Sequence, residues 1–109
     1  MPDPRALFIL MCLGAVQISA AAAEGIAPDH AARLERLVTQ DCGSCHGLTR
    51  KGGLGSPLTT EALDGVDRET LATIILDGVP GTAMPPWRPL MTEAEAYWIS
   101  DYLLKDTTQ

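Results

Sequence analysis

The stretch DCGSCHG, residues 41–47, contains two cysteines three positions apart and a histidine directly after the second. A disulfide or a redox dithiol would need only the two thiols, and a redox C-x-x-C is expected within a βαβ pattern. No stretch of this chain alternates convincingly between apolar and polar residues, so strands are not expected. A structural zinc site needs four nitrogen or sulfur ligands. Beyond this stretch the chain has only His30 and Cys12, and Cys12 lies in the N-terminal apolar run that is expected to be removed. Adjacent Cys45 and His46 also point in different directions.

The complete pattern, with its histidine, is the attachment motif of a c-type haem. The two thiols form thioethers with the two vinyl groups of the porphyrin, and a three-residue spacing on a helical turn places both sulfurs along one edge of the ring. The histidine that follows lies over the ring with its imidazole on the iron. We therefore predict that Cys42 and Cys45 hold one covalently attached haem c, with His46 as an iron ligand.

The N-terminal residues differ in composition from the rest of the chain. Arg5 precedes an apolar run over residues 6–18, and small residues follow in SAAAAEG, residues 19–25. This is the pattern of a secretory signal peptide, and the apolar run is too short for a membrane-spanning anchor. We predict cleavage after Ala23, export to the periplasm, and two regions: a signal peptide over residues 1–23 and a cytochrome c domain over residues 24–109.

Charge and size limit the remaining possibilities. The net charge is −6, which argues against binding to nucleic acid or to an anionic membrane surface. The chain has two Trp, two Tyr and one Phe, and the Phe lies in the predicted signal peptide. A domain of this length is near the lower limit of what a hydrophobic core stabilises alone, so we expect a cofactor to complete the core.

Three stretches have helical periodicity and end signals: residues 27–40, 66–78 and 92–105. The first leads directly into Cys42. Asp67 is the expected N-cap and Gly78 the expected stop of the second, and Thr92 with Glu95 forms a capping box for the third. The Gly- and Pro-rich segments between them are expected to be loops. The sequence predicts an all-α domain of three main helices with long loops.

This order of segments resembles a class I cytochrome c over residues 28–105. More narrowly, residues 40–59 and 77–103 resemble the small NirC-type periplasmic cytochromes of denitrifying bacteria and the cytochrome c domains of haem-containing nitrite reductases. The resemblance implies a class I cytochrome c fold around one haem. The family tends to have a glycine and an aromatic residue where Leu34 and Val38 stand here. We therefore expect the contact between the first and last helices to be wider or shifted.

Three side chains are candidates for the second axial position on the iron. Met84 follows Gly and Thr in a loop between two helices, where it can cross the open haem face, and Pro85 stiffens its backbone. Met91 directly precedes the capping box, where a methionine usually packs against the helix. His30 lies in the first turn of the first helix and is expected to be exposed. Met84 is the favoured ligand, and its neutral thioether favours Fe(II).

The class I resemblance implies further roles. A backbone carbonyl at Pro57, or at Ser56, is expected to accept a hydrogen bond from the second ring nitrogen of His46. Trp87 and Arg88 follow the methionine, as groups near a haem propionate do. The alternative for these two residues is ordinary packing and a solvated charge.

Basic residues in the two loops suggest a docking surface. Arg50 and Lys51 follow the haem motif, and Arg88 follows the methionine. If all three border the exposed haem edge, they form a positive rim that orients the protein toward an acidic partner. The alternative is three solvated side chains, or Arg88 neutralising a propionate.

The sequence predicts an electron carrier and not an enzyme. Two axial ligands leave the iron no room for a substrate, and no Ser/His/Asp set, phosphate loop or carboxylate pair is evident. We expect a monomeric, periplasmic, one-electron carrier with redox proteins as partners. The resemblance implies nitrite respiration, as a donor to haem nitrite reductase or in the maturation of its haem. Two alternatives are a sensor in which Met84 leaves the iron for a small ligand, and a maturation partner that acts by docking.

Overall fold

The computed structural model describes residues 25–105, and these residues form helices and loops without any strand. The elements are α1 (Pro28–Leu37), η2 (Val38–Cys42), α2 (Gly43–His46), α3 (Arg68–Asp77), η3 (Arg88–Leu90) and α4 (Glu93–Lys105). The predicted all-α class is confirmed. No helix within this part of the chain combines the length and the apolar character needed to cross a bilayer. The predicted signal peptide, residues 1–23, lies outside the described residues, so the division into two regions stays a prediction.

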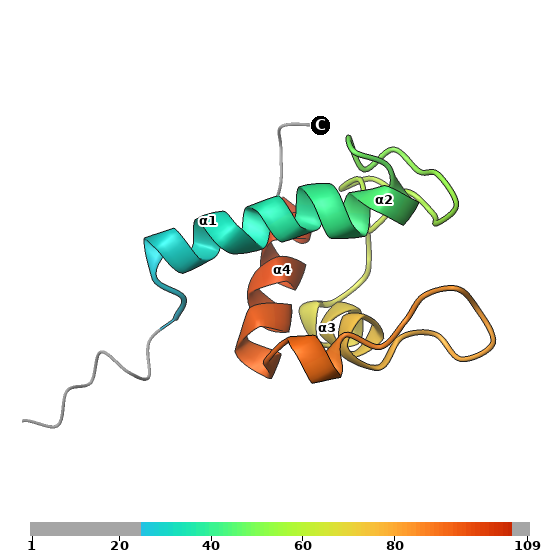
Figure 1. Cartoon of the computed structure of the whole chain (residues 1–109). Coiled ribbons are helices and arrows are strands. Elements are labelled where there is room, and N and C mark those ends of the chain that lie inside the picture. The colour runs from blue at the N-terminus through green and yellow to red at the C-terminus, as the bar shows by residue number, and fades with distance from the viewer. Residues whose placement is uncertain (1–24, 106–109) are drawn as a thin grey trace, which may run out of the picture.

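The first predicted helix continues without a break into the cysteine motif. Figure 1 shows α1, η2 and α2 as one rod that crosses the molecule. Its middle, η2, is a π-helical turn, a rare form that is often found next to functional sites. The rod ends at Gly47, whose φ of 92° lies in a region that favours glycine. A Cβ at this position would also lie 2.7 Å from the carbonyl oxygen of Gly52.

The second helix, α3, has the predicted ends. The side chain of Asp67 accepts a hydrogen bond from the Thr70 N–H at 2.7 Å and caps the first turn. Gly78 ends the helix with φ 66°. Leu71 and Ile75 on this helix are buried in the core.

The last helix, α4, begins with the predicted capping box. The Thr92 hydroxyl accepts from the Glu95 N–H at 3.1 Å, and the Glu95 carboxylate accepts from the Thr92 N–H at 2.9 Å. The other Glu95 oxygen lies 2.9 Å from His30 Nε2, which ties the start of α1 to the start of α4. The hydrogen bond from Thr92, and then that from His30, lowers the pKa of Glu95. His30, expected to be exposed, is thus partly buried beside Glu95.

The contact between α1 and α4 has its small residues on α4. Leu34 and Val38 are buried in the core on the α1 side, whereas Ala96 and Ser100 are fully buried on α4. The Ser100 hydroxyl donates to the Ala96 carbonyl at 2.8 Å, so burial leaves it hydrogen-bonded. Small side chains on α4 thus accompany the larger Leu34 of α1 and Val38 of η2. That this contact is wider or shifted relative to other class I cytochromes stays a prediction.

Candidate haem-binding site

A cavity of about 200 Å³ lies between the end of the α1–α2 rod and the loop that follows α3. The two predicted attachment cysteines and the two favoured iron ligands line it: Cys42, Cys45, His46 and Met84. Most of the other lining residues are apolar: Leu58, Leu71, Ile74, Ile75, Ala83, Pro85, Trp87, Ile99 and Leu103. The structure therefore brings both thiols, an imidazole and a thioether from distant parts of the chain to one apolar cavity.

The His46 ring is held by one hydrogen bond. Its Nδ1 lies 2.7 Å from the carbonyl oxygen of Ser56. A carbonyl only accepts, so Nδ1 is the donor, which leaves Nε2 as the ring nitrogen that could bind iron. Of the two positions expected from the sequence, Ser56 supplies the carbonyl. Pro57 packs against Gly52 instead. A Cβ added to Gly52 would lie 3.3 Å from the proline ring.

The Gly-rich loop closes around the cysteine motif at very short distances. The N–H of Gly55 donates to the Cys45 carbonyl at 2.7 Å, and the N–H of Gly52 donates to the His46 carbonyl at 2.8 Å. A Cβ on Gly55 would lie 2.7 Å from two atoms of the His46 ring. A larger residue at this position would displace the ring, so the loop backbone restricts the position of the imidazole. These contacts fit a fixed axial ligand.

The two thiols form no disulfide with each other in the structure. Burial, and secondarily the carboxylate of Asp41, raises the pKa of the Cys42 thiol to about 11. A redox dithiol needs a thiolate near neutral pH, so this environment does not favour dithiol redox chemistry. Two half-buried thiols beside an apolar cavity fit attachment to a flat apolar ligand.

Hydrogen bonds within its own loop position Met84. The Val79 N–H donates to the Met84 carbonyl at 3.2 Å and closes the loop. The Thr82 hydroxyl donates to the Val79 carbonyl at 2.7 Å and accepts from the Met84 N–H at 3.3 Å. Where the loop begins, a Cβ on Gly78 would lie 2.6 Å from the Met84 carbonyl oxygen. The loop therefore presents Met84 to the cavity from a backbone tied at several points.

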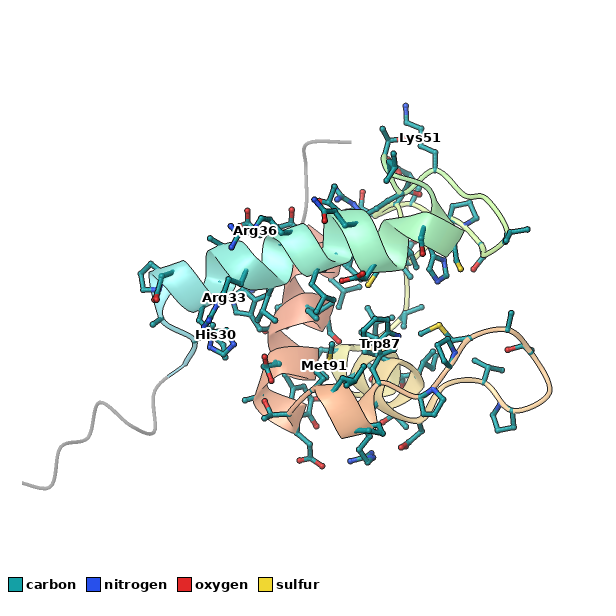
Figure 2. The ribbon with its side chains drawn as sticks, in the orientation of Figure 1. His30, Arg33, Arg36, Lys51, Trp87 and Met91 are labelled. Atoms are coloured by element: carbon teal, nitrogen blue, oxygen red, sulfur yellow. The ribbon has the colours of Figure 1, made fainter. Side chains whose placement is uncertain are left out.

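The two residues predicted near a propionate lie in different places. Trp87 lines the cavity, and its backbone N–H donates to the Ile75 carbonyl at 3.1 Å. Figure 2 shows its ring on the inner side of the loop. Arg88 is not among the lining residues. Its Nε donates to Asp77 at 2.8 Å, and Nη1 lies 3.5 Å from Glu93. The bond from Arg88 lowers the pKa of Asp77. Arg88 therefore has acidic partners within the protein.

Arg50 was expected on an exposed positive rim, and this prediction is wrong. Its exposed fraction is 7%, and its guanidinium lies 5.7 Å from the centroid of the Tyr102 ring. Tyr102 in turn stacks on Trp98 at 5.2 Å. The turn at Arg50, with φ 60°, folds the side chain back toward α4. Trp98 and Tyr102, four positions apart on α4, were the signal in the sequence that a cation could pack against an aromatic ring. Lys51 remains exposed and points away from the molecule (Figure 2).

The chain is similar to known cytochromes. Residues 29–103 match the family described as cytochrome c oxidase, cbb3-type, subunit III. Cytochrome c55X of Paracoccus denitrificans (strain Pd 1222) is 62% identical over 85 residues, which are 75% of this chain and 82% of that protein.

Two solved structures extend the comparison. The c-type cytochrome NirC has 48% sequence identity and a TM-score of 0.71, and the match covers 73% of this chain and 94% of that chain. The dihydro-heme d1 dehydrogenase NirN, in complex with DHE, has 32% identity and a TM-score of 0.63. That match covers 69% of this chain but only 16% of NirN. A domain of this kind therefore occurs both as a small separate protein and as part of a larger enzyme.

Proposed function

Because this chain belongs to the small, NirC-like class I group of c-type cytochromes, which includes cytochrome c55X, we propose that it carries single electrons between periplasmic proteins of nitrite respiration. The observation that supports this most directly is the meeting of Cys42, Cys45, His46 and Met84 at one apolar cavity. These are the residues that a haem c with two axial ligands requires.

The residues at the cavity have distinct roles in this proposal. Cys42 and Cys45 would hold one haem as thioethers, and the imidazole of His46 and the thioether of Met84 would bind its iron. The haem, when bound, supplies a one-electron iron couple. Ser56 keeps the His46 ring oriented through its 2.7 Å hydrogen bond. An apolar lining and a neutral thioether would both favour the ferrous state. With both axial positions filled, the iron has no site for a substrate, so we propose a carrier and not an enzyme.

We propose two possible electron-transfer roles within nitrite respiration. In the first, the protein donates electrons to haem nitrite reductase. In the second, it accepts electrons during the maturation of that enzyme's haem, as similarity to one domain of NirN suggests. Dehydrogenation of a dihydro-compound releases two electrons and two protons. A monohaem carrier accepts one electron at a time, so two molecules of carrier would be reduced for each product formed, and the protons would pass to solvent.

Stopped-flow spectroscopy tests the proposal and separates the two roles. The reduced holoprotein is mixed with oxidised haem nitrite reductase, and the oxidised holoprotein is mixed with a dihydro-haem d1 dehydrogenase and its substrate. Rapid oxidation in the first mixture supports the donor role, and rapid reduction in the second supports the maturation role. If the haem responds to small redox mediators but to neither enzyme, the proposed circuit is wrong. Rapid binding of carbon monoxide to the ferrous protein would instead favour the sensor alternative.

A further inference from the structure

We propose that the contact between Arg50 and Tyr102 holds the loop after the cysteine motif against α4 and thereby positions the imidazole of His46 for the iron. Arg50 is then a positioning residue, because it acts on His46 through the backbone of the loop. This inference rests on the proposed role of His46 as an axial ligand. It adds to that role a pair of residues that lies outside the haem-attachment motif.

The side chain of Arg50 is more deeply buried than is usual for an arginine. Its exposed fraction is 7%, and arginines are almost never buried to this degree unless they are paired. Its guanidinium lies 5.7 Å from the centroid of the Tyr102 ring, within the range of a cation–π contact. Tyr102 stacks on Trp98 with 5.2 Å between the ring centroids, and both rings pack against the core. Arg50 therefore contacts a ring that is itself fixed on α4.

The backbone of Arg50 has a conformation that needs support. Its φ is 60°, and no other non-glycine residue in the described part of the chain has a positive φ. Such a conformation is uncommon for a residue with a Cβ and persists where surrounding contacts impose it. The Arg50 N–H donates to the Gly47 carbonyl, and the Arg50 carbonyl accepts from the Leu58 N–H, both at 2.9 Å. These two hydrogen bonds and the contact with Tyr102 fix the same residue.

Arg50 and Leu58 are the two ends of the segment that contacts the imidazole. We call residues 50–58 the ligand loop. Within it, the Ser56 carbonyl oxygen lies 2.7 Å from His46 Nδ1, and a Cβ on Gly55 would lie 2.7 Å from the same ring. Glycine occupies three of the nine positions of the loop, so its backbone can adopt many paths unless its ends are held. Freeing Arg50 would therefore let the Ser56 carbonyl move away from the imidazole.

The hydrogen bond from Nδ1 affects how strongly the imidazole donates electrons at Nε2. A histidine that donates its second ring N–H to a carbonyl is held in one orientation and is a more basic ligand. A more basic ligand favours Fe(III) over Fe(II) and so lowers the reduction potential. Loss of the contact between Arg50 and Tyr102 should therefore weaken the bond to Ser56 and raise the reduction potential, while the haem stays attached to the cysteines.

Variants of the haem-loaded protein test this inference by spectroelectrochemistry. Arg50→Met removes the cation but keeps a long side chain, and Tyr102→Leu removes the ring without changing the net charge. Both should raise the reduction potential. The double variant should show no more than the larger single shift, because the effects of two residues in contact are not additive. Tyr102→Phe keeps the ring and should keep the parental potential.

Two control variants match these substitutions. Lys51→Met removes a positive charge one position later, from an exposed side chain that points away from the molecule (Figure 2). Tyr97→Leu removes a second ring of α4 that has a guanidinium over it, since that of Arg68 lies 4.6 Å from the Tyr97 ring centroid. Arg68 belongs to α3 and not to the ligand loop. Both controls should have a potential close to that of the parent.

Hydrogen exchange separates a local effect from a general loss of stability. In Arg50→Met, the backbone N–H groups of Gly52, Gly55 and Leu58 should exchange about tenfold faster, the size expected when a buried cation–π contact is lost. The N–H of Gly78, which donates to a carbonyl of α3, should exchange at the parental rate. The same comparison applies to Tyr102→Leu, so a failure of Arg50→Met to fold does not remove the test.

Several results would overturn the inference. These are unchanged potentials in Arg50→Met and Tyr102→Leu, a shift of equal size in either control, or exchange that becomes faster at Gly78 by the same factor as in the ligand loop. A shift in Arg50→Met and Lys51→Met alone would assign the effect to lost charge and would also overturn it. If the parent itself had no reversible one-electron couple, the proposed electron-carrier function would have failed, and the positioning role with it.

Discussion

The imidazole of His46 donates its Nδ1 proton to the carbonyl oxygen of Ser56 across 2.7 Å, and Gly55, the residue before Ser56, contacts the same ring. One short segment therefore both orients the imidazole and limits its movement. The sequence separation of 10 residues is spanned by a loop that returns to the motif through backbone hydrogen bonds to Cys45 and His46. The orientation of the imidazole thus depends on the backbone of the loop.

Gly55→Ala should disturb the imidazole without affecting the cysteines. The added Cβ would lie 2.7 Å from the His46 ring, so the ring or the loop must shift. We expect a changed reduction potential and a loss of about 1–3 kcal/mol of stability, as for overpacking. Spectroelectrochemistry and urea unfolding measure these effects. Gly65→Ala is the control, because a Cβ there meets only open space: its φ of 80° should reduce stability but leave the potential unchanged.

Met84→His should keep the haem attached and lower the reduction potential. Imidazole stabilises Fe(III) better than a thioether does, and axial ligands set haem potentials over a range of about 0.8 V, so we expect a shift on the order of 0.1 V or more. Met91→Leu should change the potential little, because Met91 is buried in the core rather than among the cavity-lining residues. Equal potentials in the parent and Met84→His would show that Met84 is not a ligand.

Glu95→Gln should weaken the acid sensitivity of folding. Hydrogen bonds from Thr92 and His30 lower the pKa of Glu95 in the folded state. Its carboxylate therefore contributes stability above the unfolded pKa of about 4.3, and this contribution is lost as the pH falls through the lower folded value. Glutamine keeps an acceptor for the capping box but does not titrate. Urea unfolding between about pH 3 and pH 7 should show a smaller acid loss in the variant.

The exposed turn residue Glu61 supplies the comparison for that experiment. Glu61→Gln should leave the acid-dependent loss close to that of the parent. Asp67 and Asp77 also have lowered pKa values, so part of the acid sensitivity should persist in Glu95→Gln. A variant with the full parental acid loss would mean that Glu95 does not contribute to it.

Arg50→Glu should destabilise the fold rather than redirect docking. The side chain is buried against Tyr102, so the substitution replaces a cation–π contact with a buried carboxylate, at a cost of about 2 kcal/mol or more. Lys51→Glu, one position later and exposed, should stay within about 0.5 kcal/mol of the parent. Denaturant unfolding of both holoproteins distinguishes them. Similar stabilities would indicate that Arg50 is solvated, as the sequence alone suggested.

Local signals in the sequence predicted the helices well. Asp67, Gly78 and the Thr92–Glu95 pair act within one helical turn, and each lies where the pattern predicted it. The cavity-lining methionine was also predictable, because Met84 lies in a proline-stiffened loop and Met91 precedes a helix cap. Such features depend on neighbouring residues only, so a single sequence contains the information needed to predict them.

Long-range contacts were not predictable in the same way. The burial of Arg50 depends on Tyr102, and the partner of Arg88 depends on how α3 approaches the following loop. The choice of Ser56 over Pro57 as the acceptor for His46 depends on the exact path of a glycine-rich loop. Glycines allow many such paths, and tertiary packing selects one of them.

The central claim is that Cys42 and Cys45 hold one haem covalently at the described cavity. Mass spectrometry of the exported protein under denaturing conditions tests it most directly, because thioether bonds survive unfolding whereas axial ligation does not. The predicted result is the mass of the processed chain plus one haem, with the haem lost in a variant that replaces both cysteines with alanine. A haem-free chain with an intact disulfide between Cys42 and Cys45 would contradict the account.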